Sequence, residues 1–368
     1  MKRFIIQYKI IGLMLLFVGG VSMGQPFEKS RSLSKSFKVN EDTEVQISNK
    51  YGNIQLIPWE NDSIKFDIDF SVVANKESKL NNIYDYIDFD FNNSQHFIDV
   101  QTSFAGKGTF WSDVKDLAGT VFAGGTKTQI NYKIYLPAYL SIKIDNKYGD
   151  VFTSDHDGPI SIILSNGDLK SHSFNGKTSL NLKFTSANIK YIKDGNIDIS
   201  YYSDLQLDEA EDLIITSRSS KLYIDKSNNL EINSNRDKYY LDSVNELNAT
   251  NAFTYLEIKN LGEKIKANTN YGDIIIKSLN RTVSTMIIDI ESTDVRISKE
   301  ADQSIRLKVK YNEKAGLYFP SVLKNKETLK VDGDKKLVIT KGLLGEKNEN
   351  TIILNSTNLS GELRINNK

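Results

Sequence analysis

One short pattern recurs along the chain about every 18 residues, and this repeat limits the possible folds more than any other feature. The block Asn-Lys-Tyr-Gly-Asp-Val at 146–151 is echoed at 49–54 and at 270–274. If the glycine of this block is used as a marker, equivalent positions follow at steps of 16 to 21 residues. A steady period of this length predicts stacked structural units. The markers are Gly149, Gly167, Ala187, Ser203, Ser220, Asp237, Thr254, Gly272 and Thr293.

Each repeat predicts two short strands. Two residues after every marker stands a large, mainly apolar side chain, from Val151 to Val295. A second apolar centre lies half a period away, where apolar and polar residues alternate as they do in a strand with one buried face. One unit cannot bury its apolar residues alone, whereas stacked units can. We therefore predict an all-β, right-handed parallel β-helix, or solenoid, with inserted loops at the longer steps before Ala187 and Thr293.

The sequence divides into four expected regions. Residues 1–24 predict a signal peptide, and residues 25–145 predict an N-terminal capping β region. The solenoid repeats are expected at 146–300, and residues 301–368 are expected to form irregular C-terminal coils that cap the other end. A capping sheet is needed because an open solenoid end exposes unpaired strand edges.

The first residues have the features of a signal peptide. Lys2 and Arg3 precede an apolar run from Ile10 to Val18 that is too short to span a bilayer, and small residues stand before Gln25. A buried N-terminal strand is the alternative. The signal peptide predicts export to the periplasm, the cell surface or the medium, with no transmembrane anchor in the mature chain.

A segment of another kind interrupts the capping region. Between 111 and 122 apolar residues recur at spacings of three and four, which predicts a short helix. This helix either packs on the cap or carries Phe110 and Trp111 to a partner or a membrane. Strands with clear alternation are expected on either side, at 64–70, 87–91 and 130–136.

Composition excludes several functions. The chain has no cysteine, which removes thiol catalysis and thiolate metal sites, and its 47 basic and 47 acidic residues give no electrostatic case for nucleic acid. The three histidines, His96, His156 and His172, have no metal-ligand spacing, and no nucleophile or phosphate-binding motif is present. We expect no catalytic residue, no cofactor and no metal.

Aromatic residues just before the markers are the remaining candidates for binding. Tyr148, Tyr202, Phe253 and Tyr271 either form a sugar-binding ladder along one corner or pack inside that corner, and packing is the simpler expectation. Together with Phe110 and Trp111, the three tyrosines are the candidate partner-binding residues.

The Asn-Lys-Tyr-Gly-Asp-Val block, the strand end at 134–137 and the repeat resemble the DUF4097-like family of proposed bacterial adhesins, over roughly residues 45–295. Adhesin head domains of proposed auto-transporters look similar. The resemblance implies an exported β-solenoid without catalytic residues. We therefore expect a non-enzymatic, adhesin-like binding or scaffold protein of the cell envelope, whose ligand is an envelope component, a glycan or a protein. The alternatives are a polysaccharide lyase-like enzyme and a periplasmic partner of an envelope-sensing system.

Overall fold

The computed structural model describes residues 26–94, 96–104, 125–332, 336–346 and 351–368. These residues are nearly all β, and their twenty strands join one large, mostly parallel sheet. The expected signal peptide and the expected helix near 111–122, with Phe110 and Trp111, lie outside the described residues. Among the described residues, no helix has the length and apolar character needed to cross a membrane.

The chain divides into two compact units, the smaller of which comprises Met1–Arg31, Ser71–Ile87 and Phe104–Thr128. Its described part holds helix α2 (Glu77–Tyr86), which the sequence did not predict because only Leu80 and Ile83 mark its buried side. Lys29, near the start of strand β1 (Phe27–Lys38), lies 4.1 Å from the ring centroid of Tyr84 and 3.6 Å from Asp85.

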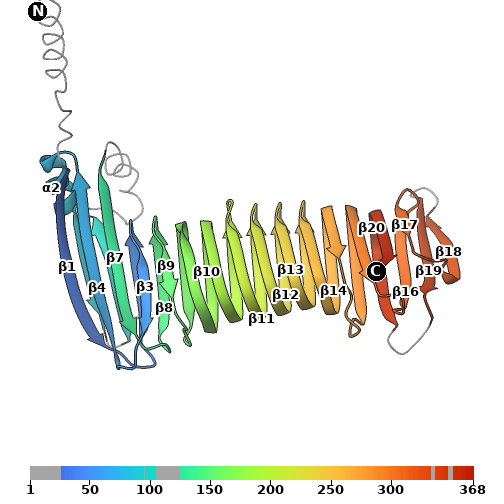
Figure 1. Cartoon of the computed structure of the whole chain (residues 1–368), viewed down its shortest axis with the longest axis horizontal. Helices are drawn as coiled ribbons and strands as arrows, with labels where there is room; N and C mark the ends of the chain where they lie inside the picture. Colours follow the sequence, from blue (N-terminus) through green and yellow to red (C-terminus); the bar gives the residue numbers. More distant parts are fainter. Residues whose placement is uncertain (1–25, 95, 105–124, 333–335, 347–350) are drawn as a thin grey trace, which may run out of the picture. The chain divides into compact units, whose positions relative to one another are not determined.

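The larger unit is built from strands that pair in parallel with the next strand along the chain. We call each repeat in this stack a rung, and Figure 1 shows the rungs side by side in chain order. Leu205, Leu222, Tyr239 and Leu256 are in register and buried, so the predicted apolar column is confirmed. The strands are β10 (Ile160–Ser200), β11 (Asp204–Arg218), β12 (Lys221–Asn235), β13 (Lys238–Ala252), β14 (Tyr255–Ile276) and β15 (Thr285–Lys299).

One predicted marker is wrong. Ala187 pairs with Leu205, which stands two residues after a marker, so the marker of this rung is Thr185. Thr185 donates its hydroxyl to the Lys183 carbonyl at 3.0 Å and its backbone N–H to Ser203 Oγ at 3.0 Å. The step of 20 residues therefore becomes 18, and the loop expected there is absent. The step of 21 is confirmed, because Gly272 pairs with Thr293.

A rung from the N-terminal region also joins the stack. Strands β2 (Glu44–Lys50) and β3 (Ile54–Pro58) pair in parallel with β8 (Ser141–Lys147) and β9 (Val151–Thr153), so Asn49 lies opposite Asn146. The other side of this rung pairs in parallel with two strands that are also far away in the sequence. These are β6 (Phe97–Phe104), which pairs with β2, and β7 (Lys127–Leu136), which pairs with β3. Strand β4 (Ser63–Ala74) also pairs with β7. Strand β5 (Ile87–Asn93) follows helix α2 in the chain.

The last strand of the chain is inserted into the stack out of order. Strand β20 (Ile352–Asn367) pairs in parallel with β15 on one side and with β16 (Ile305–Asn312) and β17 (Gly316–Tyr318) on the other (Figure 1). Beyond β16, β19 (Leu337–Leu344) and β18 (Lys324–Asp332) continue the sheet in antiparallel fashion. In this antiparallel pair Leu329 lies opposite Ile339 and Lys330 lies opposite Val338.

Candidate functional site

One corner of the stack is formed by residues with left-handed backbone conformations. The residue before each marker, and Tyr51 before the equivalent Gly52, has a φ between 47° and 67°, although none of these residues is glycine. In the rung of Ser203 both Tyr201 and Tyr202 have such an angle. Such angles are uncommon for bulky side chains and cost about 1 to 3 kcal/mol each, so they persist only where the surrounding structure imposes them. We call this series the left-handed corner. Its members are Tyr51, Tyr148, Asn166, Phe184, Tyr201, Tyr202, Ser219, Arg236, Phe253, Tyr271 and Ser292.

Aromatic rings at the left-handed corner stack in pairs. Ring centroids are 5.6 Å apart for Tyr51 and Tyr148, 5.4 Å for Phe184 and Tyr201, and 5.1 Å for Phe253 and Tyr271, with interplanar angles of 9°, 16° and 8°. Except for Tyr51, these rings are exposed, so the expectation that they pack inside the corner is wrong. The exposed fractions are 44% for Tyr148, 52% for Phe184, 46% for Tyr201, 86% for Tyr202, 53% for Phe253 and 49% for Tyr271.

Buried polar side chains hold the corner from inside. Asn146 Nδ2 donates to the carbonyls of Gly52 at 3.1 Å and Gly149 at 2.8 Å. Asp237 accepts hydrogen bonds from two hydroxyls and two backbone N–H groups. Backbone groups that turn at a corner would otherwise be buried without partners, so these side chains fix the backbone that presents the rings.

A groove of about 520 Å³ borders the left-handed corner. Its lining, which we call the polar groove, includes Tyr201 of the corner and the outward-facing side chains of the strands that lead into it. Most of these side chains are amides or hydroxyls, such as Thr216, Asn233 and Thr250, which neighbouring rungs bring into register. Lys183 and Arg218 line the same groove, against the single acidic side chain of Asp198.

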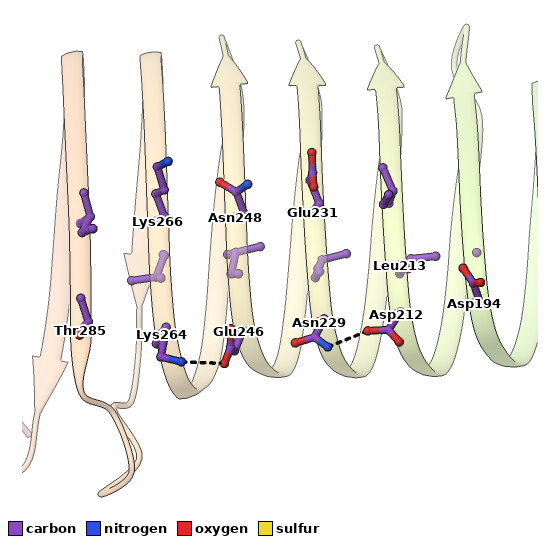
Figure 2. A pocket seen from close by; sticks show the side chains of 16 residues that line it. Asp194, Asp212, Leu213, Asn229, Glu231, Glu246, Asn248, Lys264, Lys266 and Thr285 are labelled. Carbon is purple, nitrogen blue, oxygen red and sulfur yellow. Dashed lines mark hydrogen bonds and ion pairs between the residues drawn. The ribbon is translucent and has the colours of Figure 1, made fainter.

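A second groove, of about 580 Å³, lies at the other end of the same strands and is shown in Figure 2. We call it the charged groove. A row of polar side chains runs along its edge, in which Asn229 donates to Asp212 at 2.6 Å and Lys264 to Glu246 at 2.9 Å (Figure 2). Hydrogen bonds from Lys264 to Glu246 and to Glu263 raise the pKa of this lysine. Lys264 therefore stays protonated at neutral pH.

Lys50 is the most unusual titratable group near the corner. Its side chain is buried, with Nζ 4.7 Å from the ring centroid of Tyr51 and 5.7 Å from that of Tyr148. Burial and the positive charge of Lys147 lower the pKa of Lys50 to about 8. Among the described residues, this ammonium has ring faces but no carboxylate as neighbours.

The structure brings two of the candidate residues, Tyr148 and Tyr271, into stacked pairs at one corner, and places Tyr202 there as its most exposed ring. Sequence reasoning missed Phe184 and Tyr201 as binding candidates. The corrected marker Thr185 would have identified Phe184, since this residue directly precedes it. The two grooves have no signal in the repeat pattern, because their residues are ordinary outward-facing strand positions.

No group of three or more His, Asp or Glu side chains suited to a metal ion occurs within the described ranges. Comparison with protein-family models and with curated proteins finds no match.

Solved structures show distant similarity. A proposed cell adhesion protein of Clostridium sporogenes ATCC 15579 is 11% identical over 92% of this chain and 100% of that one, with a TM-score of 0.20. A proposed adhesin of Parabacteroides distasonis ATCC 8503 is 12% identical over 73% and 96%, with a TM-score of 0.38. A proposed lipid binding protein of the same strain is 12% identical over 72% and 93%, with a TM-score of 0.33. At these identities and TM-scores the similarity assigns neither a ligand nor an activity to this chain.

Proposed function

We propose that this chain is an exported, non-enzymatic, adhesin-like binding protein of the bacterial cell envelope, built on a right-handed parallel β-solenoid. The observation that carries the proposal is the left-handed corner, where exposed and stacked rings are held by a constrained backbone beside the polar groove. Aromatic side chains with one solvent-exposed polar edge are favoured at binding surfaces. Grooves in which a few polar groups have fixed positions are typical of ligand sites.

The repeat explains why such a surface suits binding to an extended ligand. Each rung presents nearly the same side-chain positions at the spacing of neighbouring strands, about 4.8 Å. A ligand with repeating units would therefore meet equivalent groups several times, and many weak contacts would add up through effective concentration.

The charged groove favours binding over catalysis of the polysaccharide lyase type. A lyase needs a base to remove a proton, and a lysine serves as one only when its pKa is low. Lys264 is held as a cation by Glu246 and Glu263, which raise its pKa. Two of the groove's carboxylates also have partners, since Asp212 accepts a hydrogen bond from Asn229 and Glu246 accepts one from Lys264.

The test is binding of the purified chain to an array of glycans and matrix proteins, followed by variants of the corner. Saturable binding that Tyr271→Ala weakens at least tenfold supports the proposal. Tyr223→Ala is the control, because Tyr223 is also exposed and stacked but lies within strand β12, outside the left-handed corner. Release of unsaturated sugar products from any bound glycan would replace the proposal by the lyase alternative. Absence of binding to every member of the array would contradict it.

A further inference from the structure

Cations gather on the outward face of the sheet at the C-terminal end of the stack. In β16, Ile305, Leu307 and Val309 are at most 1% exposed and point into the core, so the residues between them point outward. Residues directly opposite on paired strands share a face, so β20, β16, β19 and β18 present one surface together (Figure 1). We call eight of its side chains the basic patch: Arg306, Lys308, Lys310, Leu329, Ile339, Lys341, Leu343 and Ile353.

The fold does not neutralise the four cations of the basic patch. Within the described part of the chain none of them forms an ion pair, although the nearby Lys330 pairs with Glu313 at 3.3 Å. Glu327 of β18 lies opposite Lys341, yet in the same described ranges these two side chains form no ion pair. On its other side Lys341 lies directly opposite Lys308, an arrangement of like charges that destabilises a sheet. An anionic partner would relieve this repulsion.

Charge along this outward face is segregated. Paired strands connect Glu246 of β13 to Arg306 of β16 in one continuous row. The part of the face that forms the charged groove carries the carboxylates of Asp212, Glu231 and Glu246 (Figure 2). The whole chain has 47 basic and 47 acidic residues, so composition alone does not produce a cationic region. A surface of one sign favours a partner of the opposite sign.

Aliphatic side chains lie among these cations. Leu329 is 55% exposed and Ile353 is 41% exposed, while Ile339 and Leu343 are partly exposed. Single-stranded nucleic acid binds where bases stack on aromatic rings, and these four side chains are aliphatic. Cations beside exposed aliphatic groups suit the interface of an anionic bilayer, where apolar side chains reach the acyl boundary and ammonium groups meet lipid phosphates.

We propose that the basic patch docks this chain on a membrane surface that contains anionic lipids. Its cations contact the lipid phosphates, and Leu329 and Ile353 enter the acyl boundary. An acidic protein is disfavoured as the partner, because lysine is depleted at protein interfaces and three of the four cations are lysines. The patch shares no residue with the left-handed corner or the polar groove, so the inference goes beyond the proposed binding function.

The test is sedimentation of the purified chain with vesicles of equal parts phosphatidylcholine and phosphatidylglycerol, and with vesicles of phosphatidylcholine alone. Binding to polyglutamate, an acidic polypeptide, is measured in parallel. We expect the chain to bind the phosphatidylglycerol vesicles at least tenfold more tightly than the neutral vesicles. Added salt should weaken this binding, because it screens the attraction between exposed charges.

Replacement of the two opposed lysines tests the electrostatic part. One cation beside an anionic membrane contributes about fivefold to binding, so the double variant Lys308→Gln, Lys341→Gln should bind about 25-fold more weakly. Its thermal midpoint should not fall, because the two like charges oppose each other in the folded chain. The matched control is the double variant Lys193→Gln, Lys238→Gln, which removes two exposed lysines outside the patch and should leave binding unchanged.

Replacement of an aliphatic side chain tests the apolar part. Leu329→Ser should weaken binding to the phosphatidylglycerol vesicles about tenfold, since serine buries less apolar area in the acyl boundary. Ile214→Ser is the matched control, because Ile214 is 47% exposed on the same face but lines the charged groove. This control should bind the vesicles as tightly as the unchanged chain.

Four results would overturn the inference. They are absence of binding to the phosphatidylglycerol vesicles, equal binding to both kinds of vesicle, unchanged binding for either the double lysine variant or Leu329→Ser, and tighter binding of polyglutamate than of the vesicles. The last result would replace the membrane by an acidic protein partner. The proposed binding function would stand in each case, because the glycan array and Tyr271→Ala test it separately.

Discussion

Replacement of Asp237 by alanine tests whether the buried polar side chains hold the left-handed corner. The Asp237 carboxylate is 2% exposed and accepts from Ser217 Oγ at 2.7 Å, Ser234 Oγ at 2.6 Å, Ser220 N at 2.7 Å and Asn235 N at 2.9 Å. An alanine would leave all four donors without this acceptor.

The expected loss comes mainly from the two backbone groups. The hydroxyl of Ser217 also contacts Tyr239 Oη at 2.6 Å, and that of Ser234 contacts Thr254 Oγ1 at 2.7 Å, so both hydroxyls keep a partner. The N–H groups cannot turn away, and each buried unsatisfied group costs about 1 to 3 kcal/mol. Asp237→Ala should therefore lower the free energy of unfolding by about 2 to 6 kcal/mol.

The repeat itself provides a matched rescue for this substitution. Ser203 occupies the marker position two rungs away and accepts the Thr185 N–H through Oγ at 3.0 Å. Asp237→Ser should therefore satisfy the Ser220 N–H in the same way and recover about half of the lost stability. Urea unfolding measures the total change, and amide hydrogen exchange shows whether Ser220 and Asn235 lose protection. A loss under about 1 kcal/mol with both amides still protected would refute this account of the corner.

Three other substitutions test different parts of the fold. Ile274→Asp puts a charge into the fully buried column and should abolish cooperative thermal unfolding of the adjacent rungs. The outward-facing Ile275→Asp is the control and should shift the midpoint of thermal unfolding little. Equal midpoints for the two variants would reject the register. Lys50→Met should raise the thermal midpoint most below pH 8, where the folded chain must hold a disfavoured charge. This advantage should shrink between pH 8 and 10.5 as the folded and then the unfolded lysine lose their protons, and an advantage constant with pH would contradict the shifted pKa. Asp289→Ala removes the acceptor of the Thr357 backbone N–H at 2.6 Å and should speed hydrogen exchange in β20, which unchanged exchange would disprove.

The sequence predicted the apolar column but assigned one rung two residues out of register. The rule of a large apolar residue two positions after the marker selected Ile189, because Ala187, the residue that occupies the column, is small. A slip of two residues leaves every side chain on its correct face, since strand side chains alternate with period two. Hydrophobic pattern alone therefore cannot detect it, and the strand register together with the hydrogen bonds of Thr185 reveals the true marker.

The repeat pattern could not predict the order of the strands or the exposure of the rings at the left-handed corner, for a different reason. The pattern at 361–365 predicts a strand of the repeat type, but a parallel strand fits equally well against any open edge. Its place between β15 and β16 depends on which edge the rest of the chain leaves open. Likewise, Tyr148 has a positive φ, which sequence does not specify for a residue other than glycine.

Stability alone does not explain why rings occupy the left-handed corner. A left-handed conformation costs a non-glycine residue about 1 to 3 kcal/mol, and a stacked aromatic pair contributes about 0.5 to 1.5 kcal/mol. Stacking thus offsets at most part of the strain of two residues, and glycine would avoid that strain altogether. The rungs of Asn166 and Ser219 adopt the same corner without any ring, so the fold does not require one. Rings at most of the other positions are what we expect where a surface is shaped for a ligand.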